Sequence, residues 1–212
     1  MLAVERLTFA YRRGSEPVID DLTHRFEPGA VTAVTGPSGC GKSTLLYLLA
    51  LLLTPSAGSV TYGGRSVSRL SDGDRSRLRA SSVGFVFQDA VLDPSRSVAA
   101  NVAEGGLYGG LSARVARRRA VPLLERFGVG HRASHRPGEV SGGQAQRVAL
   151  CRALMKSPSL VLGDEPTGNL DLDSAGSVWD ALRIAAGDGA TVVVATHDLS
   201  LAADADLRLT LA

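Results

Sequence analysis

Residues 36–43 have the types and spacing of a phosphate-binding loop, because they read Gly-Pro-Ser-Gly-Cys-Gly-Lys-Ser and follow the pattern G-x-x-x-x-G-K-[ST]. The glycines let backbone N–H groups curl around an anion, and a following helix adds the positive end of its dipole. Lys42 would reach the β- and γ-phosphates, and the Ser43 hydroxyl would bind Mg²⁺. A buried strand is predicted at 31–35 and a helix at 44–53, so the loop has the flanks that this chemistry needs. The pattern predicts binding of a nucleoside triphosphate; the alternative is a chance glycine-rich turn.

Two adjacent carboxylates, Asp164 and Glu165, follow an apolar strand that begins at Leu160. Ligands collect at the carboxyl ends of parallel strands, so both side chains would face the bound phosphates. Asp164 would hold Mg²⁺ through its water shell, and Glu165 would activate the attacking water as a general base. Such a pair often only begins a turn, but together with the phosphate loop it predicts hydrolysis.

A hydroxyl and two glycines, Ser141, Gly142 and Gly143, precede Gln144 at the start of a predicted helix. This arrangement is a second anion-binding feature, although a simple helix cap by Ser141 is the alternative. Two phosphate-binding features and one acidic pair suggest that two parts of an assembly meet around one triphosphate.

The composition describes an ordinary globular protein of 212 residues, with 44% hydrophobic residues and a net charge of +2. The total charge gives no reason to expect nucleic acid or an anionic membrane as the main partner. Two distant cysteines, Cys40 and Cys151, favour a reduced cytosolic protein over a disulfide framework. The longest apolar run, 45–53, is too short to span a bilayer. We therefore expect a soluble protein whose membrane role would come through a partner.

Strand and helix patterns alternate in the first and last parts of the chain. Strands are predicted at 2–9, 22–26, 31–35, 59–62, 83–87, 160–162, 191–196 and 207–211, and helices at 44–53, 72–80 and 174–186. Between about Asp89 and Ser157 only helices are predicted, at 97–107, 112–127 and 144–156. The alternation predicts a parallel, helix-covered sheet. We therefore expect one domain, 1–212, with a core lobe at about 1–88 and 158–212 and an inserted helical lobe at about 89–157.

Further motifs occur in a consistent order along the chain. With them, the chain resembles the ATPase subunit of ATP-binding cassette (ABC) transporters over essentially its whole length. Residues 140–147 resemble the signature motif, Gln88 the Q-loop glutamine and His197 the switch histidine. Residues 169–171 (Asn-Leu-Asp) resemble the D-loop, and Tyr11 falls where the family places an aromatic ring that stacks on adenine.

The resemblance implies an α/β fold: a P-loop NTPase core, RecA-like with a mostly parallel sheet, with N-terminal antiparallel strands and an inserted helical lobe. It implies ATP and Mg²⁺ as cofactors and hydrolysis by in-line attack of water. Two cassettes would dimerise head to tail, with each ATP between the phosphate loop of one chain and the signature motif of the other. The partner would be a membrane permease on another chain, which would hold this cytoplasmic protein at the inner face of the membrane, and no nucleic acid would be involved.

The resemblance also implies the site residues. Catalysis would depend on Glu165, His197 and Lys42, and Mg²⁺ would be bound by Ser43, Gln88 and Asp164. The nucleotide would be bound by Tyr11, Gly36, Pro37, Ser38, Gly39, Cys40, Gly41, Lys42, Ser43, Thr44, Gln88, Ser141, Gly142, Gly143, Gln144 and Asp171.

Residues 164–171 are similar to the branch of the family that serves macrolide export, lipoprotein release and cell division. Export or extrusion is the function that we expect. Two alternatives stay open: a cell-division ATPase that controls wall remodelling without transport, and a soluble ATP-gated clamp of the DNA-repair kind. The clamp is disfavoured because its long coiled-coil or zinc-bearing insertion is not seen here.

Three other features are expected to be structural. His131 and His135 have the i, i+4 spacing of a metal pair, but no third ligand lies near them in the sequence, so a solvated loop is expected. The arginine-rich run at 114–119 is expected to form a solvated face that could contact acidic permease loops or lipid headgroups. Trp179 is expected to fill the core.

Overall fold

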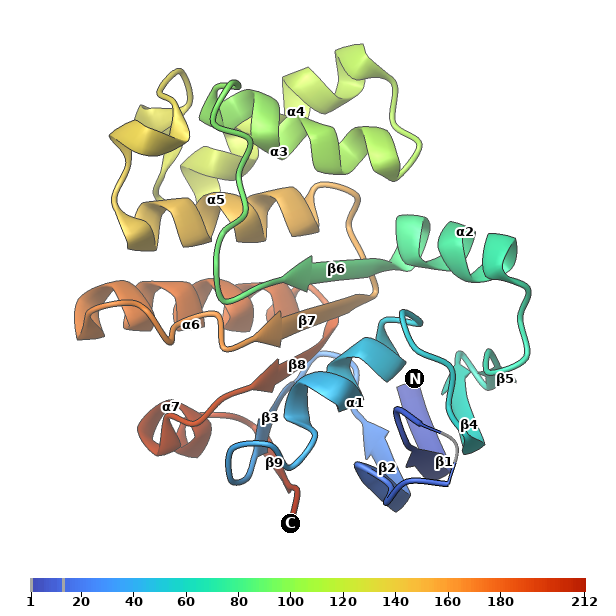
Figure 1. The fold of residues 1–212 in the computed structure, drawn as a ribbon. Helices are drawn as coiled ribbons and strands as arrows, with labels where there is room; N and C mark the ends of the chain where they lie inside the picture. The colour runs from blue at the N-terminus through green and yellow to red at the C-terminus, as the bar shows by residue number, and fades with distance from the viewer. Residues whose placement is uncertain (1, 13) are drawn as a thin grey trace.

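The computed structural model describes residues 2–12 and 14–212, and its strands form two sheets (Figure 1). A parallel sheet has the order β6-β7-β8-β3-β9, made of Val83–Val86, Leu160–Asp164, Thr191–Ala195, Val31–Thr35 and Leu207–Thr210. An antiparallel sheet has the order β2-β1-β4-β5, made of Ile19–Phe26, Leu2–Phe9, Ala57–Tyr62 and Arg65–Ser66. The predicted parallel sheet and the N-terminal antiparallel strands are both confirmed.

Six helices lie within a few residues of their predicted positions: α1 (Lys42–Leu49), α2 (Asp72–Ser82), α3 (Val98–Tyr108), α4 (Ala113–Arg126), α5 (Gly142–Leu154) and α6 (Leu172–Gly187). The structure adds α7 (Leu199–Ala203) and short 3₁₀ helices at Gly130–Arg132 and Pro137–Glu139. Every residue of 89–157 is described, and this stretch contains helices and no strand. In Figure 1, α3, α4 and α5 lie together beside β6, which places a helical lobe next to the sheet.

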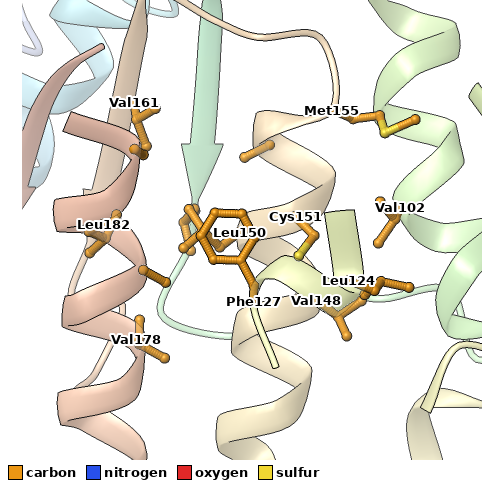
Figure 2. Close-up of a cluster of buried hydrophobic side chains, with 14 of the residues drawn as sticks. Val102, Leu124, Phe127, Val148, Leu150, Cys151, Met155, Val161, Val178 and Leu182 are labelled. Carbon is orange, nitrogen blue, oxygen red and sulfur yellow. The ribbon is translucent and has the colours of Figure 1, made fainter. Parts of the chain in front are cut away.

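The two faces of the parallel sheet belong to two separate hydrophobic cores. Val161, Val192 and Val194 pack into the core formed with the helical lobe and α6. Their strand neighbours Leu162 and Val193 pack into the core formed with α1 and the antiparallel sheet. Because successive side chains of a strand point to opposite faces, an apolar run buries residues on both. Figure 2 shows part of the first core, where Leu182 and Val178 of α6 face α5 and the helical lobe. Trp179 is also buried there, with 2% of its surface exposed, as predicted.

The strand register brings the predicted site residues to one edge of the sheet. Asp164 at the end of β7 pairs with Ala195 at the end of β8, and Ala195 also pairs with Val34 of β3. All three strands are parallel, so the segments that follow them emerge side by side. The phosphate loop after Thr35, the acidic pair and His197 therefore meet at the carboxyl edge.

The predicted helix at 44–53 was too long at its C-terminal end, because α1 ends at Leu49. Leu51 adopts a left-handed backbone conformation, with φ of 58°, which stops the helix. Its carbonyl oxygen accepts hydrogen bonds from the guanidinium groups of Arg75 and Arg79 on α2. The apolar pattern continued past Leu49, but this distant contact ends the helix.

Strand β2 begins at Ile19, whereas the sequence predicted a start at Leu22. Ile19 pairs with Phe9 of β1, and Asp20 and Asp21 continue the strand although neither is apolar. Pairing with β1 thus extends the strand to residues whose own apolar pattern does not predict one. The short elements β5 and α7 were also not predicted, because two and five residues carry little periodicity.

Candidate functional site

Glycines shape the loop between β3 and α1. Gly36 has φ of 145° and Gly41 has φ of 96°. A Cβ atom at Gly36 would lie 2.4 Å from the carbonyl oxygen of Leu211, and one at Gly41 would lie 2.9 Å from the carbonyl oxygen of Val18. Side chains are therefore excluded at both positions, and the backbone is free to curve around an anion.

Helix α1 begins directly after this loop without a capping side chain. Gly41 occupies the N-cap position, and the first turn contains no acidic residue. Each of α2 to α7 instead begins at a serine or aspartate whose side chain accepts a backbone N–H of the first turn. In the described part of the chain, no side chain accepts a hydrogen bond from the N–H groups at the start of α1, which suits a phosphate. Lys42 Nζ donates to the carbonyl oxygens of Gly36 (2.9 Å) and Pro37 (3.1 Å), so its charge lies over the loop.

Asp164 is held by two hydroxyl groups of α1. Ser43 Oγ donates to Asp164 Oδ1 at 2.8 Å, and Tyr47 Oη donates to Asp164 Oδ2 at 3.3 Å. Burial, and then the charge of Asp164, raises the pKa of Tyr47, so the phenol keeps its proton. Oxygen donors of this kind fit Mg²⁺, which takes one or two protein ligands together with phosphates and water. In the described ranges, 2–12 and 14–212, no cluster of three or more His, Cys, Asp or Glu residues could form an all-protein metal cage.

Glu165, the second carboxylate, is hydrogen-bonded to His197, which follows β8. Its Oε2 accepts the backbone N–H of His197 at 3.2 Å and the Nδ1–H of the same residue at 2.8 Å. The histidine side chain is 69% exposed, whereas that of Glu165 is 17% exposed. Glu165 itself has φ of 48°, an unusual conformation for a side-chain-bearing residue at the point where the chain leaves β7. The structure thus brings the predicted base and the predicted switch histidine into direct contact.

The side chain of Tyr11 lies beside the first turn of α1. Its hydroxyl group is 2.9 Å from Thr44 Oγ1, and its ring meets Phe9 edge to face with 5.0 Å between the ring centroids. The tyrosine is 61% exposed, so most of the ring is available for stacking. Its position near the phosphate loop is compatible with a role in holding a nucleotide base.

Gln88 lies against the segment after the acidic pair. Its Nε2 donates to Asn169 Oδ1 at 3.4 Å, and Asn169 Nδ2 donates to Asp89 Oδ1 at 3.4 Å. In the part of the chain that the structure describes, no hydrogen bond joins Gln88 to Ser43 or Asp164. Of the three predicted metal ligands, Ser43 and Asp164 are hydrogen-bonded to each other, whereas Gln88 lies beside the D-loop.

The second predicted anion site lies at the start of α5, next to α6. Ser141 Oγ accepts the N–H of Gln144, and Gln144 Oε1 accepts the N–H of Ser141, so the helix is capped. A Cβ atom at Gly143 would lie 2.5 Å from Ser174 Cβ, so close packing of α5 on α6 also requires this glycine. Asp171 caps α6 through the N–H of Ser174 at 2.9 Å, which is the main reason that its pKa is lowered.

Two residues with contacts in the site were missed by sequence reasoning. Tyr47 follows Ser43 by four positions, so the i, i+4 spacing on one helix face could have indicated it. Gln146, which is 2% exposed, donates from Nε2 to the carbonyl oxygens of Phe87 (2.5 Å) and Gln88 (3.2 Å). Its sequence neighbourhood gives no signal for this long-range contact, which connects α5 to the segment that carries Gln88.

His131 and His135, which have the spacing of a metal pair, lie outside this site. His135 Nε2 is 3.0 Å from Arg132 Nη1, and His131 is exposed in the first 3₁₀ helix. They belong to no candidate metal cluster among residues 2–12 and 14–212. No helix in these ranges is long and apolar enough to cross a membrane.

Comparison with known proteins places this chain in a family. The family model described as "ABC transporter" matches residues 19–168. The lipoprotein-releasing system ATP-binding protein LolD of Xanthomonas campestris is 44% identical over 214 residues, covering all of this chain and 90% of that protein. The macrolide export ATP-binding/permease protein MacB of Burkholderia pseudomallei is 42% identical over 207 residues, covering 97% of this chain and 32% of MacB.

A solved structure agrees with these matches. The dimeric structure of an ATP-binding cassette in a post-hydrolysis state, bound to ADP and Pi, has a TM-score of 0.88 at 32% identity. The match covers all of this chain and 94% of that one, which confirms the predicted P-loop core with antiparallel N-terminal strands and a helical lobe. The chain belongs to the ABC transporter family, in which it is an ATP-binding and ATP-hydrolysing subunit.

Proposed function

We propose that the carboxyl edge of the parallel sheet binds ATP together with Mg²⁺ and hydrolyses it. The observation that carries this proposal is the junction at the end of β7. There Asp164 accepts a hydrogen bond from Ser43 of the phosphate loop, and the next residue, Glu165, accepts one from His197. Both carboxylates thus lie beside the phosphate loop, where Asp164 would bind the metal ion and Glu165 would act as the general base.

The nucleotide would lie along the start of α1. The loop N–H groups and Lys42 would bind the phosphates, while the exposed ring of Tyr11 would stack on the adenine. Ser43 and Asp164 would hold Mg²⁺, with Gln88 approaching from the D-loop side once nucleotide is bound. The bound Mg²⁺ would supply charge neutralisation of the β- and γ-phosphates.

Glu165 would accept a proton from the attacking water, because its carboxylate is held in a fixed position at the strand end. Because Nδ1–H of His197 donates to Glu165, the Nε2 atom of the largely exposed ring could donate to a γ-phosphate only if it carried a second proton. Lys42 and the loop N–H groups would stabilise the charge of the transferred phosphoryl group, so the chain contributes mostly positioning and electrostatics.

We also propose that each active site is shared between two chains. Within residues 2–12 and 14–212, no hydrogen bond joins the start of α5 to the phosphate loop. The start of α5 instead packs on α6, where a Cβ atom at Gly143 would lie 2.5 Å from Ser174 Cβ. A relative that crystallised as a dimer with ADP and Pi supports this arrangement.

Mixed variants test the shared site. Lys42→Ala and Ser141→Arg should each be inactive alone, since each damages one half of every site. In a mixed dimer, shared sites would place both defects in one site and leave the other intact. Mixing should therefore restore part of the Mg²⁺-dependent ATP hydrolysis, together with up to one bound ATP per dimer. No recovery in either measurement, with mixed dimers demonstrated, would contradict the shared site without affecting the assignment of Glu165.

ATP hydrolysis would power export or extrusion through a permease on another chain, at the cytoplasmic face of the membrane. Two sequence similarities support this proposal. LolD is an ATP-binding protein of nearly the same length as this chain, and the match to MacB, an ATP-binding/permease protein, covers about a third of that protein. Co-purification from native membranes should recover a permease with a large extracytoplasmic domain. Recovery without any membrane protein would contradict the proposed coupling.

A further inference from the structure

Positive charge is concentrated on α4. Its 14 residues include five arginines and a single acidic residue, Glu125, which give the helix a formal charge of +4. The whole chain carries only +2, so the rest of the chain is net negative. The small total charge therefore conceals a strongly basic helix.

Most of this charge has no partner within the chain. Arg126 is paired with Asp188 through two hydrogen bonds of 2.6 and 2.8 Å. The other four arginines are all exposed, and among residues 2–12 and 14–212 no carboxylate lies within 4.0 Å of them: Arg114, Arg117, Arg118 and Arg119. Neighbouring like charges on one helix repel each other, so an anionic surface would relieve an unfavourable interaction.

The basic face borders an apolar hollow. Arg118, Arg119 and Arg126 line a cavity of about 580 Å³ together with Pro122, Leu123 and Met155, among others. The opposite face of α4 is buried in the core through Ala116, Ala120 and Leu124. The helix is therefore fixed in orientation, and it can present its arginines to a surface without leaving the fold.

We propose that this face of α4 binds the headgroups of anionic phospholipids at a membrane surface. Guanidinium groups bind phosphate through paired N–H donors, and the apolar hollow suits the glycerol and upper acyl region of a lipid. The arginines are spread over an exposed helix face, so they match the dispersed charge of a lipid surface better than one acidic peptide. The contact would be peripheral, and it does not require the proposed permease.

Vesicle sedimentation of the purified chain tests this proposal. At low salt, the wild-type chain should sediment with vesicles of phosphatidylcholine and phosphatidylglycerol but not with pure phosphatidylcholine. The triple variant Arg117→Gln/Arg118→Gln/Arg119→Gln should bind anionic vesicles roughly 10- to 100-fold more weakly. Raising the salt concentration should weaken wild-type binding, because exposed charges are screened. Unfolding midpoints and ATP hydrolysis without vesicles should stay unchanged in the variant.

A matched control removes the same charge elsewhere. Arg25→Gln/Arg65→Gln/Arg69→Gln changes three exposed arginines near the antiparallel sheet and should bind vesicles like the wild type. An equal loss in both triple variants would reduce the effect to net charge and overturn the proposal. Equal binding to neutral and anionic vesicles would also overturn the proposal. A lack of binding to anionic vesicles at low salt would overturn it as well and would favour an acidic protein partner. A comparable loss in Lys42→Ala would assign the lipid phosphate to the nucleotide site.

Discussion

At the scale of residues, adjacent carboxylates have different surroundings. Asp164 accepts hydrogen bonds from two hydroxyl groups of α1, whereas Glu165 accepts from His197 after β8. The backbone turns sharply at Glu165, with φ of 48°, so the two side chains reach different elements. This separation fits the proposal that one acid serves a metal ion while the other serves a water molecule.

Glu165→Gln should lower the rate of ATP hydrolysis about 10²- to 10⁴-fold, the usual contribution of a positioned base. The amide oxygen can still accept from His197, and Lys42 and Ser43 remain, so ATP binding should persist. Phosphate release and equilibrium ATP binding measure the two effects. Glu5→Gln, at an exposed position of β1, is the control and should behave like the wild type. Wild-type turnover in Glu165→Gln would remove this residue from the mechanism.

At the scale of elements, α5 supports the site through its N-terminal half. Its first turn carries the Ser141 cap, and one turn later the buried amide of Gln146 donates to the carbonyl oxygens of Phe87 and Gln88. Gln88 in turn donates to Asn169 of the segment that leads into α6. The segment after β6 is thus connected to α5 through its backbone carbonyl groups, which otherwise would need another donor, and to the start of α6 through a hydrogen bond between side chains.

Gln146→Met keeps the side-chain length but removes the donor, which leaves two carbonyl oxygens without it. We expect a loss of about 1–3 kcal/mol in the free energy of unfolding. We also expect a lower hydrolysis rate under conditions where the variant is fully folded, because the position of Gln88 is less well defined. Urea denaturation and phosphate release measure the two effects.

Asn101→Leu is a matched control for this variant. Asn101 is also a fully buried amide, but it donates to the carbonyl oxygens of Asp93 and Ser97, away from the site. The control should lose stability without losing turnover. Equal losses of turnover in the two variants would show that Gln146 acts through stability alone.

At the scale of the whole molecule, one lysine joins the helical lobe to α2. Lys156 Nζ, just after α5, donates to the carbonyl oxygen of Arg79 at 2.8 Å. Burial lowers the pKa of Lys156 from 10.5 to about 8. The charged form is therefore disfavoured in the folded state, so the contribution of Lys156 to the free energy of unfolding depends on pH.

The stability of the wild type relative to Lys156→Met should rise as the pH increases from about 8 toward 10. In this range the folded state has lost the lysine proton while the unfolded chain, with its pKa near 10.4, still holds it. Solvent screening of the partly exposed group limits the rise to about 1 kcal/mol. Urea denaturation of both proteins at several pH values measures it. A difference that stays constant with pH would contradict the lowered pKa.

The sequence by itself determined the features that depend on neighbours along the chain. The phosphate loop between a strand and a helix, the acidic pair at a strand end and the cap at Ser141 are all local patterns. The order of these patterns also indicated the family. Element types followed from periodicity, because the apolar runs of β7 and β8 and the amphipathic helices bury the faces that their spacing predicts.

Only the tertiary structure decided which distant groups touch. Tyr47 and Asp164 are 117 positions apart, and Gln146 and Phe87 are 59 apart, yet each pair forms a hydrogen bond. The end of α1 was decided by arginines of α2, and the start of β2 by pairing with β1. These contacts depend on the strand order β6-β7-β8-β3-β9 and on the packing of helices against its two faces. Local propensity carries no information about either, because the distance between remote segments is set by the shared cores that bury them.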